Sequence, residues 1–107
     1  VIVGGDWNQC APGFKADFTK DVMDYNDNLY IDDNLFESDW TWLYDNKVPT
    51  NRRNSTAYKQ GETLTTVIDF YLLSPNITGL SVNNVEAGFM YSDHQAVKAN
   101  VKLLPKK

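Results

Sequence analysis

A short apolar run that ends in two glycines and two polar side chains constrains the fold most strongly. Residues 1–5 are Val-Ile-Val-Gly-Gly, and Asp6 and Asn8 follow closely. A continuous β-branched run is typical of a strand buried on both faces, and glycines let the backbone turn where that strand ends. In extended backbone Asp6 and Asn8 point to the same side. The segment therefore predicts a buried strand that leads either to a site or to a polar turn.

A second strand is predicted at residues 65–73, where the composition favours β-structure but Asp69 lies in the middle of the run. Both faces of this segment are largely apolar, which is typical of an interior strand in a covered sheet. A carboxylate in such a place needs a partner, because burying it unpaired is strongly unfavourable. Asp69 is therefore a candidate functional or paired residue.

The only histidine of the chain, His94, ends the sequence Tyr-Ser-Asp-His at residues 91–94. It precedes an alternating run at residues 95–103, which predicts the last strand. The residues expected to face inward in that strand are Val97, Ala99, Val101 and Leu103. A shorter strand is expected at residues 80–85.

One helix is predicted between residues 14 and 30. Phe14, Phe18, Val22 and Tyr25 are separated by four, four and three positions, which is the spacing of one face of a helix. The lysines and aspartates between them would form its solvated face.

Composition limits the class of protein. With 107 residues the chain has room for a single domain spanning 1–107. The net charge of −4 provides no overall basic surface for nucleic acid, and no apolar run is long enough to span a membrane. The single cysteine, Cys10, excludes an internal disulfide; we expect it to be a small buried apolar residue.

Three short motifs occur in a characteristic order: Gly-Asp-Trp-Asn at residues 5–8, Ile-Asp-Phe at residues 68–70 and Ser-Asp-His at residues 92–94. Together they resemble the endonuclease/exonuclease/phosphatase superfamily. Its members are metal-dependent phosphoesterases such as abasic-site endonucleases, DNase I-like nucleases, sphingomyelinases and inositol-phosphate 5-phosphatases. Trp7 stands where the family often has phenylalanine, and Phe70 stands where it often has tyrosine.

The resemblance implies an α/β (α+β) fold. The chain would supply the C-terminal half of a four-layer α/β sandwich, mostly one β-sheet with a flanking helix. The family's principal magnesium-binding glutamate lies in the N-terminal half, which has no counterpart here. Because the chain also begins within a predicted strand, we expect a longer parent protein. The missing N-terminal half would then be a partner of this chain, and the chain alone would have little or no activity.

The resemblance also implies a role for each motif residue. Asp6 orients or deprotonates the attacking water, and Asn8 hydrogen-bonds the scissile phosphate. His94 contacts that phosphate while Asp69 buttresses the imidazole. Mg²⁺ or Mn²⁺ is the implied cofactor, with Asp93 and Asp6 as its ligands in this chain. These residue types suit the chemistry, because phosphoester hydrolysis needs an activated water and charge neutralisation, and hard cations take oxygen ligands.

The basic loop at residues 47–59 contains Arg52 and Arg53. Guanidinium groups pair well with phosphate oxygens, which makes both residues candidate substrate contacts, although charged loops are commonly just solvated. The expected partner is a phosphoester substrate. The acidic chain favours a small or lipid-linked phosphoester over duplex DNA.

Two other functions compete with hydrolysis. The first is a non-catalytic β-rich binding module that uses Trp40, Trp42 and Tyr44, with Asp69 paired to an arginine. Trp40 and Trp42 alternate and would share one face of an extended segment, although core packing or a sheet edge is the simpler explanation. The second is self-association that covers an exposed sheet face.

Overall fold

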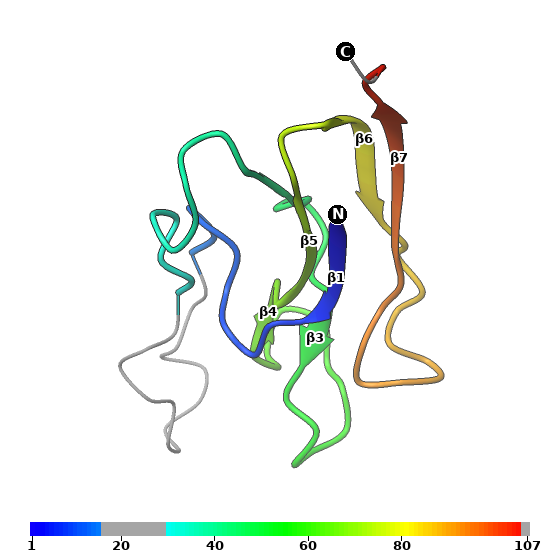
Figure 1. Ribbon diagram of the computed structural model, residues 1–107. Coiled ribbons are helices and arrows are strands. Elements are labelled where there is room, and N and C mark those ends of the chain that lie inside the picture. Colours follow the sequence, from blue (N-terminus) through cyan, green and yellow to red (C-terminus); the bar gives the residue numbers. More distant parts are fainter. Residues whose placement is uncertain (16–29, 106–107) are drawn as a thin grey trace.

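The computed structural model describes residues 1–15 and 30–105, and all regular secondary structure in these residues is β-strand (Figure 1). The strands are β1 (Ile2–Asp6), β2 (Thr41–Leu43), β3 (Asn51–Arg52), β4 (Thr65–Thr66), β5 (Asp69–Leu73), β6 (Ile77–Asn84) and β7 (Val97–Leu103). They form a three-stranded sheet in the order β1-β5-β2 and two two-stranded sheets, β3-β4 and β6-β7. No helix in the described part is long and apolar enough to cross a membrane.

The expected α/β (α+β) architecture, half of a four-layer sandwich with one sheet and a flanking helix, is wrong. The described residues form an all-β structure with small separate sheets. The physical reason is the direction of pairing: β1 and β2 both run antiparallel to β5, and antiparallel neighbours need no helical crossover. The helix predicted between residues 14 and 30 falls almost entirely outside the described residues.

β1 is an edge strand, which contradicts the prediction of a strand buried on both faces. Among the described residues β5 is its only sheet neighbour, and Val1, Ile2 and Val3 remain 65, 49 and 41% exposed. A β-branched run indicates a preference for strand geometry, whereas burial depends on which other segments cover it. Nothing among the described residues covers this run.

The strand predicted at residues 65–73 is interrupted in the middle. The carbonyl of Val67 accepts a hydrogen bond from the N–H of Ala11, and that of Ile68 accepts one from Trp7, both at 2.8 Å. These groups therefore bond the segment after β1 instead of a strand partner, and regular pairing resumes only at Asp69. Beyond the break, β5 lies between β1 and β2, as predicted for an interior strand.

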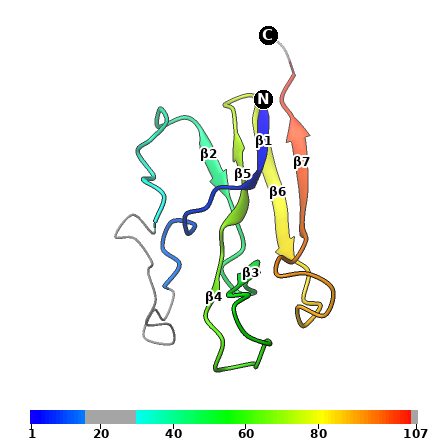
Figure 2. The same cartoon turned by 90° about the horizontal axis from the view of Figure 1, so that it is seen from below.

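β6 and β7 form an antiparallel ribbon (Figure 2). β6 is longer than the strand predicted at residues 80–85, and β7 begins two residues later than predicted, at Val97. The inward alternation is confirmed for Val97, Ala99 and Val101, which are half-buried between exposed neighbours. It is wrong for Leu103, which is 67% exposed near the end of the ribbon.

Aromatic rings build the core around Phe70, which is 1% exposed. The ring of Trp7 stacks on Phe70 at a centroid distance of 5.8 Å, and Trp42 contacts it edge-on at 5.7 Å. The indole N–H of Trp7 also donates to the carbonyl of Phe70 at 2.9 Å. Trp7 therefore anchors the chain just after Asp6 to the buried strand β5, as expected for an indole whose N–H finds a partner.

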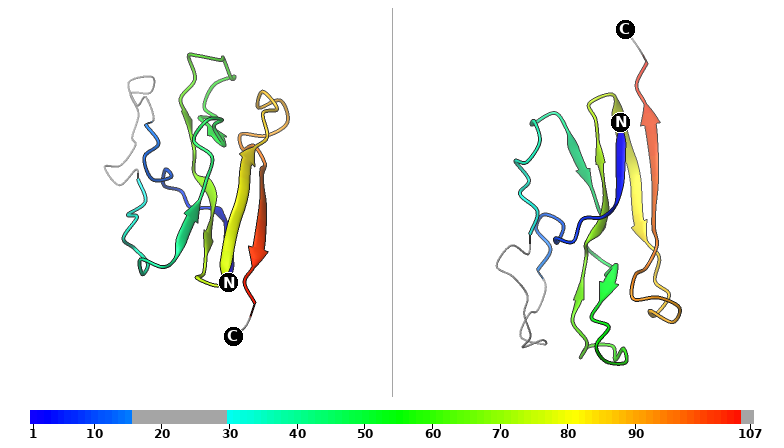
Figure 3. Two further views of the ribbon diagram at one scale, coloured as in Figure 1. Left: turned by 90° about the horizontal axis from the view of Figure 1, so that it is seen from above. Right: turned by 60° about the horizontal axis from the view of Figure 1, so that its bottom comes forward.

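The β6-β7 ribbon lies alongside the three-stranded sheet (Figure 3). The hydroxyl of Tyr71 on β5 donates to the carbonyl of Val97 on β7 at 2.9 Å. Gly4 makes this contact possible, because a Cβ atom at that position would lie 2.5 Å from the Tyr71 ring. A strand glycine that permits such close approach is a packing requirement.

Candidate active site

Segments far apart in the sequence meet where β1 ends and β5 begins. The register of the two strands places Asp6 opposite Asp69, and His94 forms an isolated antiparallel bridge with Asn51 of β3. In Figure 1 the end of β1, the β3-β4 hairpin and the loop at residues 85–96 all lie in the lower part of the molecule. The strand pairing therefore brings the three sequence motifs together.

His94 lies between two carboxylates. Its Nδ1 atom is 2.9 Å from Oδ2 of Asp69, and its Nε2 atom is 3.8 Å from Oδ2 of Asp6. The first distance is that of a hydrogen bond to a charged acceptor, and the second is too long for a direct hydrogen bond. One potential ligand atom from each of the three residues lies within 4.8 Å of the others. The cluster is compact enough to act on one small group.

The two carboxylates differ in exposure, and both affect the imidazole. The side chain of Asp69 is 17% exposed, whereas that of Asp6 is 48% exposed. Partial burial lowers the pKa of His94. The hydrogen bond and charge of Asp69, together with the charges of Asp6 and Asp93, have a larger effect in the opposite direction, so the pKa lies above its ordinary value. Asp69 is thus the shielded partner of His94, and Asp6 faces solvent.

Thr50, which is fully buried, holds the start of β5 in place. Its hydroxyl oxygen accepts hydrogen bonds from the N–H groups of Ile68 at 3.0 Å and Asp69 at 3.2 Å. These two donors lie at the junction between β4 and β5. Thr50 therefore provides the hydrogen-bond acceptor for the backbone N–H groups of Ile68 and Asp69.

Gln95, which is also buried, ties the histidine loop to the same segment. Its backbone N–H donates to the carbonyl of Thr50 at 2.7 Å, and its side-chain amide donates to the carbonyl of Pro49 at 2.9 Å. Its side-chain oxygen accepts from the N–H of Ala87 at 2.6 Å. Buried polar groups satisfied in this way hold a loop rigidly, so the position of His94 is determined by its neighbour.

Asn8 shapes the turn after β1. It adopts a left-handed backbone conformation with φ of 55°, and its N–H donates to Oδ1 of Asp6 at 2.8 Å. This is the polar turn that the sequence allowed as an alternative. It engages one oxygen of Asp6 and leaves the other, Oδ2, on the side of His94. The phosphate contact expected of the Asn8 side chain stays a prediction.

Asn51 completes the surroundings of His94, and the sequence did not single it out. Its Nδ2 atom lies 3.2 Å from Nε2 of His94 and 3.1 Å from the backbone carbonyl of Asp93. In the sequence it is one amide in a basic loop, where arginines dominate the pattern. The only signal that identifies it is the pairing of β3 with the histidine loop, which is a tertiary feature.

The other predicted site residues lie outside the three-residue cluster. The carboxylate of Asp93 accepts a hydrogen bond from Nδ2 of Asn54 at 3.1 Å. The guanidinium of Arg52 donates to the carbonyls of Arg53 and Thr56 at 2.9 and 3.4 Å, which folds it onto its own loop. Metal binding by Asp93 and substrate contacts by the two arginines stay predictions.

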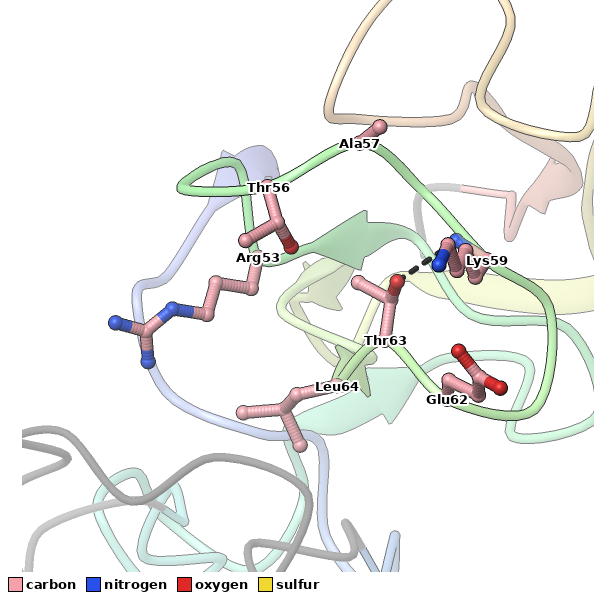
Figure 4. A pocket seen from close by; sticks show the side chains of 7 residues that line it. All are labelled: Arg53, Thr56, Ala57, Lys59, Glu62, Thr63 and Leu64. Atoms are coloured by element: carbon pink, nitrogen blue, oxygen red, sulfur yellow. Dashed lines mark hydrogen bonds between the residues drawn. The ribbon is translucent and has the colours of Figure 1, made fainter.

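Arg53 borders a pocket of about 450 Å³ in the β3-β4 loop. In Figure 4 its guanidinium points away from Lys59 and Glu62, so the charged groups of this pocket do not converge. A smaller pocket of about 220 Å³ adjoins the cluster instead and is lined by Gly5, Asp69, Phe70, Tyr71, Gln95, Ala96 and Val97. The space beside Asp69 is therefore the better candidate for a substrate group.

The aromatic residues of the alternative binding surface are largely engaged in packing. Trp42 and Tyr44 pack against the buried core cluster, while Trp40 contacts Phe36 at a centroid distance of 5.4 Å. This packing favours the core interpretation of Trp42 and Tyr44. Phe36 in turn contacts Trp42 at a centroid distance of 6.0 Å, which connects Trp40 to the same aromatic packing.

Cys10 is buried, as expected, with 2% of its surface exposed. Burial raises the pKa of its thiol to about 11, against a smaller opposing effect of a backbone hydrogen bond with Val67. The thiol is therefore protonated at neutral pH, and a protonated thiol is a poor nucleophile.

No protein-family model, curated protein or solved structure matches this chain. The resemblance to phosphoesterases therefore stays a prediction from the three sequence motifs.

Proposed function

We propose that this chain carries the acid–base residues of a metal-dependent hydrolase of phosphoester bonds. The observation that carries the proposal is the position of His94, with Nδ1 at 2.9 Å from the shielded carboxylate of Asp69 and Nε2 at 3.8 Å from the exposed carboxylate of Asp6. Such a series of carboxylate, imidazole and second carboxylate provides a proton acceptor and a donor on the same small surface.

Asp6 is the proposed proton acceptor for the attacking water. Its Oδ1 atom is held by the N–H of Asn8, and its other oxygen faces the imidazole and solvent. A carboxylate oriented in this way can align a water and take its proton as the oxygen attacks phosphorus. The ester P–O bond then breaks, and the leaving oxygen departs with the bonding electron pair.

His94 is the proposed phosphate contact. Its pKa lies above the ordinary value because the effect of the surrounding carboxylates exceeds that of partial burial, and this favours the imidazolium form. With Nδ1 bonded to Asp69, the Nε2 side of the ring is the side that can donate to a phosphoryl oxygen. A preorganised donor of this kind stabilises the charge that develops in the transition state.

The donor set suits Mg²⁺ or Mn²⁺ in part. Mg²⁺ is commonly bound by one or two carboxylates together with substrate phosphate and water, and Asp6 and Asp93 would be the carboxylates here. Asp69 is already engaged by Nδ1 of His94. When bound, the ion would neutralise charge on the phosphoryl oxygens. The remaining ligands would be oxygen atoms of the substrate phosphate and of water.

The test is hydrolysis of a panel of phosphomonoesters and phosphodiesters by the gene product in its natural length, with Mg²⁺ or Mn²⁺. We expect EDTA to abolish turnover and Asp6→Asn or His94→Gln to lower kcat by about 10²–10⁴-fold. Asn83→Asp, at an exposed position of β6, is the matched control and should keep full activity. The absence of any metal-dependent cleavage would reject the proposal, as would full activity in both site variants.

A further inference from the structure

We propose that Asn51 is a positioning residue of this site, whose side-chain amide fixes the His94 ring from the side opposite Asp69. The inference deepens the proposed function and rests on it for its catalytic meaning. Its structural content, a hydrogen bond from Asn51 Nδ2 to His94 Nε2, can be tested separately.

The orientation of the Asn51 amide follows from its neighbours. The backbone carbonyl of Asp93 can only accept hydrogen bonds, so the Asn51 atom 3.1 Å away must be the amide nitrogen. The same carbonyl also accepts from the N–H of Arg52 at 3.0 Å, which holds it in place. On the other side of the amide, the hydroxyl of Thr66 lies 3.4 Å from Oδ1 and can donate to it. Both ends of the amide therefore indicate the same orientation.

The amide nitrogen carries two hydrogens, and the second one faces the histidine. Nδ2 is 3.2 Å from Nε2 of His94, so this ring nitrogen accepts while Nδ1 donates to Asp69. Each donor in the series from Asn51 to His94 to Asp69 then meets an acceptor. When the ring is neutral, this arrangement selects the tautomer with its hydrogen on Nδ1. Two hydrogen bonds, one at each ring nitrogen, also hold the ring more firmly than one would.

The backbone around Asn51 is rigid enough for this role. Asn51 pairs with Thr66 in the β3-β4 sheet and forms a bridge with His94 itself. A residue whose backbone is paired on both sides positions its side chain more accurately than a residue on an unpaired loop. The exposed Asn54, three residues later, lies beyond the end of β3 and bonds the Asp93 carboxylate instead.

The consequence for catalysis is alignment. Asn51 keeps Nε2 directed into the 3.8 Å gap toward Asp6, where a phosphoryl oxygen would lie. In the substrate complex that oxygen would take the place of the amide at Nε2, so Asn51 presets the ring and takes no part in the chemical step. Loss of such a supporting contact typically costs 10–100-fold in activity in metal sites. Because the contact exists in the free enzyme and not in the substrate complex, we expect a loss of about this size in kcat/KM, with kcat nearly unchanged.

The structural test uses the fact that His94 is the only histidine. In protein labelled with [¹⁵N]histidine and [¹⁵N]asparagine, the two ring nitrogens are observed without ambiguity. At a pH where the ring is neutral, we expect Nδ1 to be protonated, Nε2 to be unprotonated, and a scalar coupling across the hydrogen bond to join Nε2 to Nδ2 of Asn51. This measurement needs no variant, and a missing coupling in the folded wild type would overturn the inference.

Two isosteric variants separate positioning from mere packing. Asn51→Asp can only accept at this position, so we expect Nε2 to become protonated at the pH at which it is unprotonated in the wild type. Asn51→Leu removes the donor, so the Nε2 signal should move toward that of an unbonded nitrogen. Asn83→Asp is the matched control and should leave the His94 ring signals and their coupling to Asn51 unchanged. If folded Asn51→Asp and Asn51→Leu both give the wild-type spectrum, the inference is wrong.

Kinetics then distinguish the two proposals. If the coupling is present but the natural-length protein has no phosphoesterase activity, the proposed function fails and the Asn51 contact stands without a catalytic role. If the protein is active and Asn51→Leu retains the wild-type kcat/KM, the function stands and Asn51 is not a positioning residue.

Discussion

At the scale of single residues, the site depends on how one imidazole is surrounded. His94 has one carboxylate at hydrogen-bonding distance and another within 4 Å, and an amide faces Nε2. The carboxylates favour the charged ring, whereas the amide of Asn51 favours an unprotonated Nε2. A phosphate group that displaces the amide would remove the second influence and leave the first.

The raised pKa of His94 makes a prediction about stability. A group whose pKa is higher in the folded protein binds its proton more tightly there, so its stabilising effect is complete below the unfolded value of about 6.5. This contribution is lost as the pH rises through the folded pKa. We expect the difference in unfolding free energy between wild type and His94→Gln to decrease across that window. Urea unfolding at a series of pH values measures it, and a difference that does not change with pH would contradict the assignment.

At the scale of elements, the association of the two larger sheets depends on a glycine. The Tyr71 ring lies against Gly4 of β1 and reaches across to Val97 of β7. Asp6 lies two residues beyond Gly4 in the same strand, and Asp69 pairs with it in β5. A change that displaces β1 at Gly4 therefore also affects the candidate active site.

We expect Gly4→Ala to destabilise the protein by about 1–3 kcal/mol, because its Cβ would overlap the Tyr71 ring and overpacking of this kind has such a cost. In a Tyr71→Ala background the overlap is gone. There the same substitution should be neutral or stabilising by about 0.4–1 kcal/mol, through its effect on the unfolded chain. A double-mutant cycle from urea unfolding measures the coupling. An equal cost of Gly4→Ala in both backgrounds would show that the ring contact is unimportant.

The interruption between β4 and β5 is the second feature at this scale. The composition of residues 65–73 favours a single strand. In the structure the carbonyls of Val67 and Ile68 accept hydrogen bonds from the segment after β1. The hydroxyl oxygen of Thr50 accepts hydrogen bonds from the N–H groups of Ile68 and Asp69. The break allows one stretch of chain to serve two sheets, β3-β4 and β1-β5-β2. It is also the reason that His94 and Asp69 meet, because Thr50 contacts the backbone of both segments.

At the scale of the whole molecule, the small sheets leave an apolar edge. β1 has β5 as its only sheet neighbour among the described residues, and its first residues are exposed β-branched side chains. Open strand edges of this composition are templates for pairing with another chain, and natural proteins commonly protect them with charge. No charged residue precedes Asp6 in this strand.

We therefore expect the chain to self-associate in a concentration-dependent way through β1. Ile2→Lys places a charge on this edge and should shift the population to monomer, whereas Leu80→Lys, at an exposed position on β6, should not. Sedimentation velocity over a range of concentrations measures both. A wild-type chain that is strictly monomeric throughout would reject this role of β1.

The sequence alone was sufficient to predict strands at the start of the chain, at residues 65–73 and at residues 95–103, where the structure has Ile2–Asp6, Asp69–Leu73 and Val97–Leu103. It also selected Asp6, Asp69 and His94 among the candidate site residues. An apolar run, a turn residue and a charged residue within an apolar strand are local signals. They depend on backbone preferences and on the cost of burying a carboxylate. Only the tertiary structure decided that the strands pair antiparallel, that Asp6 lies opposite Asp69, and that β1 is exposed. It alone brought Asn51 to His94. These outcomes depend on which distant segments come into contact, and the pattern within any one segment carries no information about its partner.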